Sequence, residues 1–422
     1  MHTTASDFQE RRRRLAQSYC GPVLLRSSQG PRLPGRFRAD GFFLYFGGWN
    51  HPNVAVLLEE GEATLFYDPP DAEQSIWEGP GPDLEQLRLR YGFRRIARLC
   101  ELPEDVPRLG PEAPLDLLQA AIDLRLLHDA AARSQLEQAV DMSVRAHFQA
   151  MRATRPERHE FQILATLLVS VTQEGGSAAF DPVVSSRGEI LRNRDYEGLL
   201  QRGQLLLVDF GARTREGWSA GLTRTFPVRT TFTPRQAEIY QVVLAAQKRA
   251  ISLCRAGQEF AEIHQAACLA LSQGLVELGL MHGDPAELVE RGAHALFFPH
   301  GTGCLLGLDV DDMYEYDDRA GYAPGRRRSS RFGLKNLSLD RPLQTHMAVT
   351  IGPGFYWIPQ ILEDSERTAP FQDCLNLETI QAYREVRGIR IEDDVLIQES
   401  DHRVLSASLP KELLELEIVV NS

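Results

Sequence analysis

Residues 205–212 read LLLVDFGA, a run of apolar residues that one carboxylate, Asp209, interrupts. Residues 388–397, GIRIEDDVLI, repeat the pattern with Glu392 close to Arg390. Apolar runs of this length next to glycine predict strands. A charged side chain inside a buried strand is costly unless it is paired or binds a metal ion. The alternative is that these residues lie at strand ends and face solvent.

The rest of the second half alternates helices with further apolar strands. Long helices are expected within 234–257 and 261–280, and strands within 222–229 and 347–359. Helices and strands mixed in this way favour an α+β domain, a sheet covered by helices.

The first part of the chain alternates shorter elements. Residues 42–49 (FFLYFGGW) and 54–70 (VAVLLEEGEATLFYDPP) are expected to contain strands, the latter turning at its acidic EEGE segment. A long amphipathic helical region is expected within 111–153. The proline-rich segment 106–114 before it is a natural boundary, so we expect domains at 1–112 and 113–422.

Composition excludes some classes of protein. Of the 422 residues, 43% are apolar and 25% charged, and the formal net charge of −12 argues against binding to a nucleic-acid backbone. The run Arg11–Arg14 is an exception. Because Ser6 and Gln9 ahead of it form a capping-box pattern, we interpret the run as the solvated face of a helix.

Cysteine usage and hydropathy bear on the compartment. The six cysteines are scattered, without a CxxC pair, which fits a reducing cytoplasm. No apolar run approaches the length of a membrane span, and no apolar core follows the charged N-terminus as in a secretory signal. A cytoplasmic protein without membrane or nucleic-acid partners is expected.

Taken in order, several segments resemble the prolidase and aminopeptidase P family. Residues 37–58 and 65–81 are similar to its N-terminal domain. Four blocks resemble the catalytic half of the family: 205–228 (LLLVDFGA…LTRTFPV), 297–310 (FFPHGTG…LGLDV), 349–356 (VTIGPGFY) and 388–397. The resemblance implies an α/β N-terminal domain over 1–112, an α+β pita-bread domain over 113–422, and a homodimer.

The resemblance also implies a metal site. The family hydrolyses the bond before proline with two divalent cations, held by two aspartates, one histidine and two glutamates, since hard cations prefer oxygen ligands. The matching positions here are Asp209, Gly221 (or Ala220, counted forward from Asp209), Cys304, Gly352 and Glu392. Because three of the five differ, we interpret the site as the remnant of a metal centre and expect no cofactor.

Four further positions surround this remnant. Two histidines that the family uses on substrate match Arg192 and Asp311, whereas His300 and Arg390 are kept. His300 is a candidate base and Cys304 a candidate nucleophile. The alternatives are a structural histidine and a small buried cysteine.

The main hypothesis is therefore a metal-independent pseudopeptidase that binds or hydrolyses a small amino-acid-like ligand. Arg192 and Arg390 would bind its carboxylate, and Asp209, Asp311 and Glu392 its amine. One alternative is a non-catalytic protein-interaction module. A second alternative is an active, metal-dependent Xaa-Pro peptidase with an unconventional site.

Overall fold

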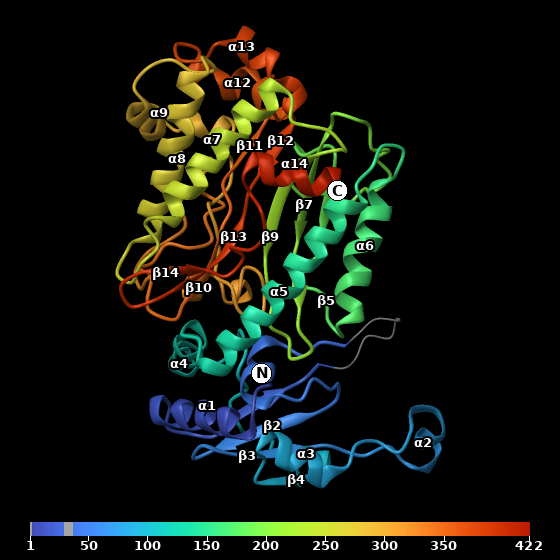
Figure 1. Cartoon of the computed structure of the whole chain (residues 1–422). Helices are drawn as coiled ribbons and strands as arrows, with labels where there is room; N and C mark the ends of the chain where they lie inside the picture. The colour runs from blue at the N-terminus through green and yellow to red at the C-terminus, as the bar shows by residue number, and fades with distance from the viewer. Residues whose placement is uncertain (1, 29–36) are drawn as a thin grey trace. The chain divides into compact units, whose positions relative to one another are not determined.

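Figure 1 shows the computed structural model, which describes residues 2–28 and 37–422. The chain divides into two compact units, and each is described by itself. The first comprises Met1–Gln135 with Glu315–Ala320, and the second comprises Leu136–Tyr314 with Gly321–Ser422. The first unit therefore runs past residue 112, where the sequence suggested a boundary.

A four-stranded sheet forms the first unit, in the order β1-β2-β3-β4. The pairs β1–β2 and β2–β3 are antiparallel and β3–β4 is parallel. Glu60 and Gly61 both adopt positive φ between β2 and β3, the geometry of a two-residue hairpin turn, so the expected EEGE turn is confirmed. Its elements are α1 Ala5–Ser18, β1 Val23–Arg26, η1 Phe43–Gly47, β2 Ala55–Glu59, β3 Glu62–Phe66, α2 Ala72–Glu78, α3 Leu84–Tyr91, β4 Arg95–Ala97, η2 Leu99–Glu101 and α4 Leu115–Leu126.

The strand expected within 42–49 is wrong, because this segment forms the helical turn η1. The Asp40 carboxylate accepts a hydrogen bond from the backbone N–H of Phe43 and starts the turn. Arg12 donates to the carbonyl of Phe46 at 2.7 Å, close to the end of the turn. Polar side chains thus satisfy backbone groups that a sheet would otherwise have paired.

The interpretation of Arg11–Arg14 as a solvated face is wrong for two of the four residues. Helix α1 begins after Thr4, whose side chain forms the capping box with Asp7. Arg11 and Arg12 are buried. Arg11 forms an ion pair with Asp129 at 2.7 Å. The arginines therefore hold the helix onto its own unit.

The second unit contains a three-stranded antiparallel sheet β6-β7-β9, a second one β10-β13-β14, and two pairs, β5-β8 and β11-β12. Both apolar runs with which the sequence analysis began are strands, β7 and the pair β12–β13, and their side chains are almost all buried. The bounds are β5 Ser177–Ala178, β6 Val183–Ser185, β7 Leu205–Phe210, β8 Ala212–Arg213, β9 Leu222–Pro227, β10 Ala348–Ile351, β11 Gly354–Tyr356, β12 Gly388–Arg390, β13 Asp393–Ile397 and β14 His402–Val404.

Helices lie on both sides of these strands in the second unit (Figure 1). α7 begins at the N-cap Thr233 with a capping box to Gln236 and a proline at its first position, which are strong start signals. The longer helices are α5 Ala130–Ala153, most of which belongs to this unit, α6 Glu160–Gln173, α7 Pro234–Ile251, α8 Phe260–Glu277, α9 Pro285–Arg291 and the C-terminal α14 Leu413–Asn421. The shorter ones are η3 Ala293–Leu296, η4 Tyr314–Tyr316 (at the edge of the unit), α11 Pro359–Leu362, α12 Ser365–Thr368, η5 Ala369–Phe371, α13 Leu377–Ala382 and η6 Arg384–Val386; α10 Asp318–Gly321 falls largely in the first unit. No helix of the described ranges has the length and apolar character needed to cross a bilayer.

The arginine run permits a matched test of this packing. We expect Arg11→Ala to lower the free energy of unfolding by about 3–5 kcal/mol, because it leaves the Asp129 carboxylate without its buried partner. Arg13→Ala removes only an exposed pair with Glu10 and should leave the free energy of unfolding nearly unchanged, because solvent screens such a pair. Urea denaturation of both variants measures the difference, and equal losses would contradict the assignment.

Candidate functional site

Three polar residues lie side by side where the strands of the second unit meet. In the register of β7 and β9, Asp209 lies opposite Thr223. Thr223 in turn forms a β-bridge with Glu392, which lies between β12 and β13. The two interrupted apolar runs of the sequence therefore bring their carboxylates to one place.

Arg390 ties this place together. Its Nη2 donates to Asp209 Oδ2 and forms a short ion pair. Its Nε donates to Thr223 Oγ1 at 3.2 Å, and its Nη1 donates to the Tyr356 hydroxyl at 3.3 Å. Burial alone would lower the pKa of Arg390, but Tyr356, Asp209 and Glu392 raise it, so the guanidinium stays charged.

Glu392 is the group whose protonation changes near neutral pH. Burial and the neighbouring charge of Asp209 raise its pKa to about 7, although Arg390 opposes this. Its Oε2 accepts a hydrogen bond from Thr223 Oγ1 at 2.9 Å, which fixes the carboxylate. A carboxylate with this pKa is suited to take up and release a proton.

His300 lies at the end of a hydrogen-bonded chain. Its Nδ1 lies 2.8 Å from the Gly301 carbonyl, which can only accept, so Nδ1 carries the proton. Nε2 then accepts from the Tyr356 hydroxyl at 2.8 Å, and Tyr356 accepts from Arg390. Burial, and next Arg390, lower the pKa of His300 to about 3. A ring with so low a pKa, whose Nε2 already accepts from Tyr356, is a weak base, which favours the structural alternative.

Cys304 lies beside Thr350 of β10. Its Sγ is 3.5 Å from Thr350 Oγ1, and its backbone N–H donates to the same oxygen at 3.3 Å. Burial raises the pKa of the thiol well above its usual value, and the charges of Asp311 and Glu392 add to the effect. Since the thiolate is the nucleophile, these surroundings disfavour the catalytic role expected for Cys304.

The other two predicted positions lie further out. Asp311 adopts a left-handed φ of 60°, an uncommon conformation for a residue other than glycine, and its charge acts on Cys304. Arg192 is exposed, and its charge lowers the pKa of His300. Within the described ranges, the Arg192 guanidinium makes no hydrogen bond or ion pair. The structure thus pairs Asp209 with Arg390 directly and connects Glu392 to them through the Thr223 hydroxyl, whereas Arg192 lies apart from these bonds.

Sequence reasoning missed Asp394. Its carboxyl oxygens accept from the backbone N–H of Gly221 at 3.1 and 3.3 Å. Burial raises its pKa well above the usual value, and the charge of Glu392 adds to the effect. The carboxyl group of Asp394, two residues after Glu392, therefore lies against Gly221, one of the two glycines at the family's metal positions. The sequence did contain a signal, because Asp394 is the third consecutive acidic residue, after Glu392 and Asp393, in a segment predicted as a buried strand.

The second glycine is closely packed. A Cβ on Gly352 would lie 2.7–2.8 Å from Cβ, Cγ and Cδ of Glu392, so that side chain fills the space beside it. A Cβ on Gly221 would meet only Val310 and Thr350, at 3.0 Å and beyond. A longer side chain at 352 would therefore have to displace Glu392.

These residues do not fit the five-donor centre for two metal ions that the resemblance implies. Gly221 and Gly352 offer no side-chain donor, and Asp209 is engaged by Arg390. Moreover, Asp209, Cys304 and Glu392 do not converge on one point: in the part of the chain that the structure describes, the single group of three His, Cys, Asp or Glu donors within 4.8 Å of one another lies elsewhere. No catalytic step is therefore derived through such a centre.

Comparison with protein families assigns both parts of the chain. Residues 134–399 match the family described as metallopeptidase family M24. Residues 8–114 match the aminopeptidase P N-terminal domain. Together the two matches span most of the chain.

Full-length relatives agree with these matches. The Xaa-Pro aminopeptidase of Haemophilus influenzae is 29% identical over 454 residues, which cover 98% of this chain and 97% of that protein. The Xaa-Pro aminopeptidase of Escherichia coli is 26% identical over 468 residues, with the same two coverages.

Solved structures show the same architecture. Aminopeptidase P from Escherichia coli with the inhibitor Pro-Leu matches with a TM-score of 0.83 at 25% identity, over 100% of this chain and 99% of that one. The aminopeptidase of Pseudomonas aeruginosa also gives a TM-score of 0.83 at 25% identity, over 99% and 98%. The expected fold class, an aminopeptidase P-type N-terminal domain followed by a pita-bread domain, is confirmed.

The same comparisons correct the expected function. The sequence analysis favoured a metal-independent pseudopeptidase that binds or hydrolyses a small molecule. That interpretation is wrong, because relatives that align along nearly the whole chain are Xaa-Pro aminopeptidases. The interpretation rested on three changed side chains, whereas the whole-chain similarity favours the second alternative, an active peptidase.

The ion pair at the centre can be tested by stability. We expect Arg390→Ala to lower the free energy of unfolding at pH 7 by about 3–5 kcal/mol, because it removes the only guanidinium bound to Asp209 among the described residues. At pH 5 the loss should be smaller, since Glu392 is then protonated.

A control for this measurement is Arg187→Ala, which breaks an exposed pair with Asp195 and should leave the free energy of unfolding nearly unchanged, because solvent screens such a pair. If both variants lose the same stability in urea, Arg390 is not the counter-charge of the site.

Proposed function

Because the chain belongs to metallopeptidase family M24 and carries an aminopeptidase P N-terminal domain, we propose that it is an Xaa-Pro aminopeptidase, which hydrolyses the bond between an N-terminal residue and proline. The observation that carries the proposal is the likeness to Xaa-Pro aminopeptidases over 98% of the chain. The juxtaposition of Asp209, Arg390 and Glu392 supports it, since these side chains form a charged centre within the matched domain.

The finer part of the proposal concerns the metal centre. We propose that it is unconventional, because only Asp209, Cys304 and Glu392 of the five family positions keep a donor side chain, and as placed they do not converge on one point. A thiol among the donors would favour borderline ions such as Zn²⁺ and Co²⁺ over Mn²⁺. Any ion bound to Asp209 has to compete with Arg390 for the same carboxylate.

Glu392 is the residue to which we assign proton transfer. As a carboxylate it can accept a proton from the water that attacks the carbonyl carbon of the first residue. The proton then passes to the proline nitrogen as the C–N bond breaks, so the base is regenerated. Thr223 and Thr350 hold the carboxylate in place, and Arg390 limits the rise in its pKa.

Substrate binding is assigned to the charged groups around this residue. The N-terminal ammonium of a peptide would be attracted to the carboxylates of Asp209 and Asp311. Arg192 is exposed and makes no ion pair within the described ranges, so its guanidinium can bind a carboxylate or carbonyl oxygen of the substrate.

We expect the pure chain to release the first residue from Xaa-Pro-Yaa peptides in buffers supplemented in turn with Mn²⁺, Co²⁺ and Zn²⁺. Glu392→Gln should lower kcat/KM by about 10²–10⁴-fold, the usual contribution of a general base. Glu399→Gln, an exposed glutamate just after β13, is the matched control and should keep full activity. No cleavage above the Glu392→Gln background with any of the three ions would reject the proposal.

The pH profile gives a second test. Since Glu392 acts as the carboxylate and its pKa is about 7, kcat/KM should fall as the pH drops below about 7. Stability should change in the opposite direction. The pKa is raised on folding, so the folded chain binds the proton more tightly, and wild-type stability is lost as the pH rises through about 7.

Glu392→Gln removes the titrating group and should flatten the stability change over that range. Urea denaturation of both proteins between pH 5 and pH 8 measures the effect. Identical slopes in the variant and the wild type would show that another group controls the profile.

A further inference from the structure

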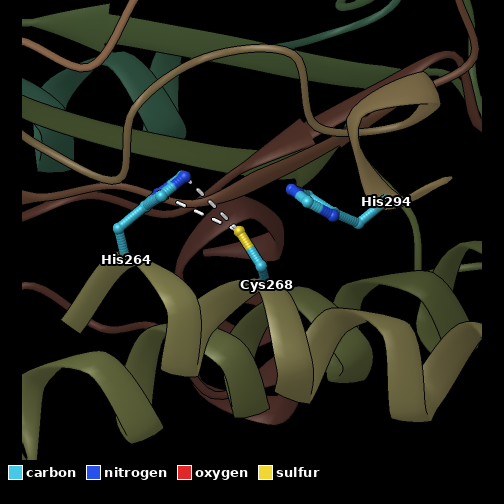
Figure 2. A group of neighbouring side chains, drawn as sticks. All are labelled: His264, Cys268 and His294. Atoms are coloured by element: carbon cyan, nitrogen blue, oxygen red, sulfur yellow. Dashed lines mark hydrogen bonds between the residues drawn. The ribbon is translucent and has the colours of Figure 1, made fainter. Parts of the chain in front are cut away.

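A second cluster of ligand-type side chains lies outside the candidate site, between α8 and η3. Figure 2 shows His264 and Cys268 rising from α8 and His294 facing them from η3. Their donor atoms all lie within 4.8 Å of one another. All three side chains are buried, at 2%, 1% and 5% exposure. From this geometry we propose that the cluster binds one thiophilic metal ion, Zn²⁺ or Cu⁺.

The spacing of the first two donors matches a metal site. Residues four apart on a helix lie on the same face, so His264 and Cys268 point to one side of α8. Cys268 Sγ lies 3.6 Å from His264 Nε2. Zn–N and Zn–S bonds at a tetrahedral angle place nitrogen and sulfur about 3.6 Å apart. An ion can therefore bind both without moving the helix.

The ring of His264 is already oriented for this role. Its Nδ1 lies 2.8 Å from Thr302 Oγ1. When Nδ1 donates to that hydroxyl, Nε2 carries the lone pair and faces Cys268. Metal-binding histidines usually hold their second ring nitrogen in this way. Thr302 thus acts as the outer partner that sets the tautomer of His264.

Within the described part of the chain, one ring nitrogen of the third donor, His294, has no hydrogen-bond partner. His294 follows Gly292, whose left-handed φ of 91° ends α9 and turns the chain into η3. One ring nitrogen of His294 points toward Cys268 in Figure 2. Its Nδ1 is buried, with no hydrogen-bond partner in the described part of the chain. A buried imidazole left this way is costly unless something binds it.

Charge decides which ions suit the cluster. Both histidines are neutral, because burial lowers the pKa of His264 to about 4 and of His294 to about 3. Burial raises the pKa of Cys268, so an ion must displace the thiol proton to bind. Two neutral imidazoles and one thiolate carry a net charge of −1. Cu⁺ would bring the net charge of the site to zero, and Zn²⁺ would bring it to +1. A soft thiolate selects these ions over Mn²⁺ or Mg²⁺.

The cluster is separate from the candidate site but connected to it by one residue. Thr302 lies between His300 and Cys304 in the same loop. A bound ion would hold α8 to η3 and, through Thr302, hold this loop to α8. The proposal does not depend on peptidase activity, and its test does not measure activity.

The test is metal retention by the full chain. Stripped protein is loaded separately with Zn²⁺ and, under anaerobic reducing conditions, with Cu⁺, then desalted against a competing chelator, and its metal content is measured. We expect the wild type to retain one ion per chain through Cys268 and to melt at a higher temperature when loaded, because a ligand of the folded state stabilises it. Cys268→Ala and His294→Ala should each lose both effects.

Two cysteine variants serve as controls. Cys254→Ala removes another buried thiol, one whose Sγ lies 3.6 Å from the Ala250 carbonyl. Cys374→Ala removes a third buried thiol, one whose Sγ lies 3.2 Å from the Phe371 carbonyl. Both should keep the ion and the shift in melting temperature. If Cys268→Ala does not fold, Cys268→Ser replaces it in the metal-retention assay. The rise in melting temperature of the loaded wild type then serves as the second readout. The proposal fails if the wild type retains neither ion, or if retention is equal with and without the Cys268 thiol.

Discussion

Three consecutive carboxyl groups, Glu392 to Asp394, have to be buried where β12 passes into β13, and each is accommodated differently. Asp393 stays ionised, because Arg224 and Lys411 lie 2.6 and 2.7 Å from its oxygens and hold its pKa well below the usual range. Burial raises the pKa of Asp394, so this carboxyl group keeps its proton. Glu392 lies between these extremes, with a pKa of about 7.

Asp393, the ionised carboxylate among the three, holds the candidate site in place through Arg224. The Arg224 side chain, fully buried on β9, binds Asp393 and also donates to the backbone carbonyls of Thr223 and Glu392, at 2.9 and 2.8 Å. It reaches the carbonyls of Leu409 and Pro410 as well. The Arg224 guanidinium therefore fixes the register between Thr223 and Glu392. This charge takes no part in the proposed reaction. The protonation behaviour of Glu392 depends on this fixed geometry.

Much of the fold could be predicted from the sequence, because apolar blocks such as 205–212 and 388–397 form the expected strands, although the block 42–49 forms a helical turn instead. Whether a polar side chain is buried, and which group it contacts, could not be predicted in the same way. Arg11 resembles a surface residue in sequence and is buried against Asp129 only because α1 and the start of α5 pack together. Asp394 was overlooked because its contact, the backbone of Gly221, lies 173 residues away. His264 and Cys268 show helical spacing in the sequence, whereas their meeting with His294 depends on the turn at Gly292.

The same limit explains why side-chain changes at the metal positions misled the functional interpretation. The changes were taken together as the loss of a metal centre, because two carboxylates fewer leave a site that can be buried without cations. With glycine at 221 and 352, two carboxylates remain near Arg390, and the guanidinium neutralises one of them directly. An ion that binds Asp209 shares this carboxylate with Arg390, whose other side-chain contacts, to Thr223 and Tyr356, are neutral hydroxyls. Metal binding and the ion pair therefore oppose each other here, and the affinity of the centre for a cation is set by how firmly Arg390 is held.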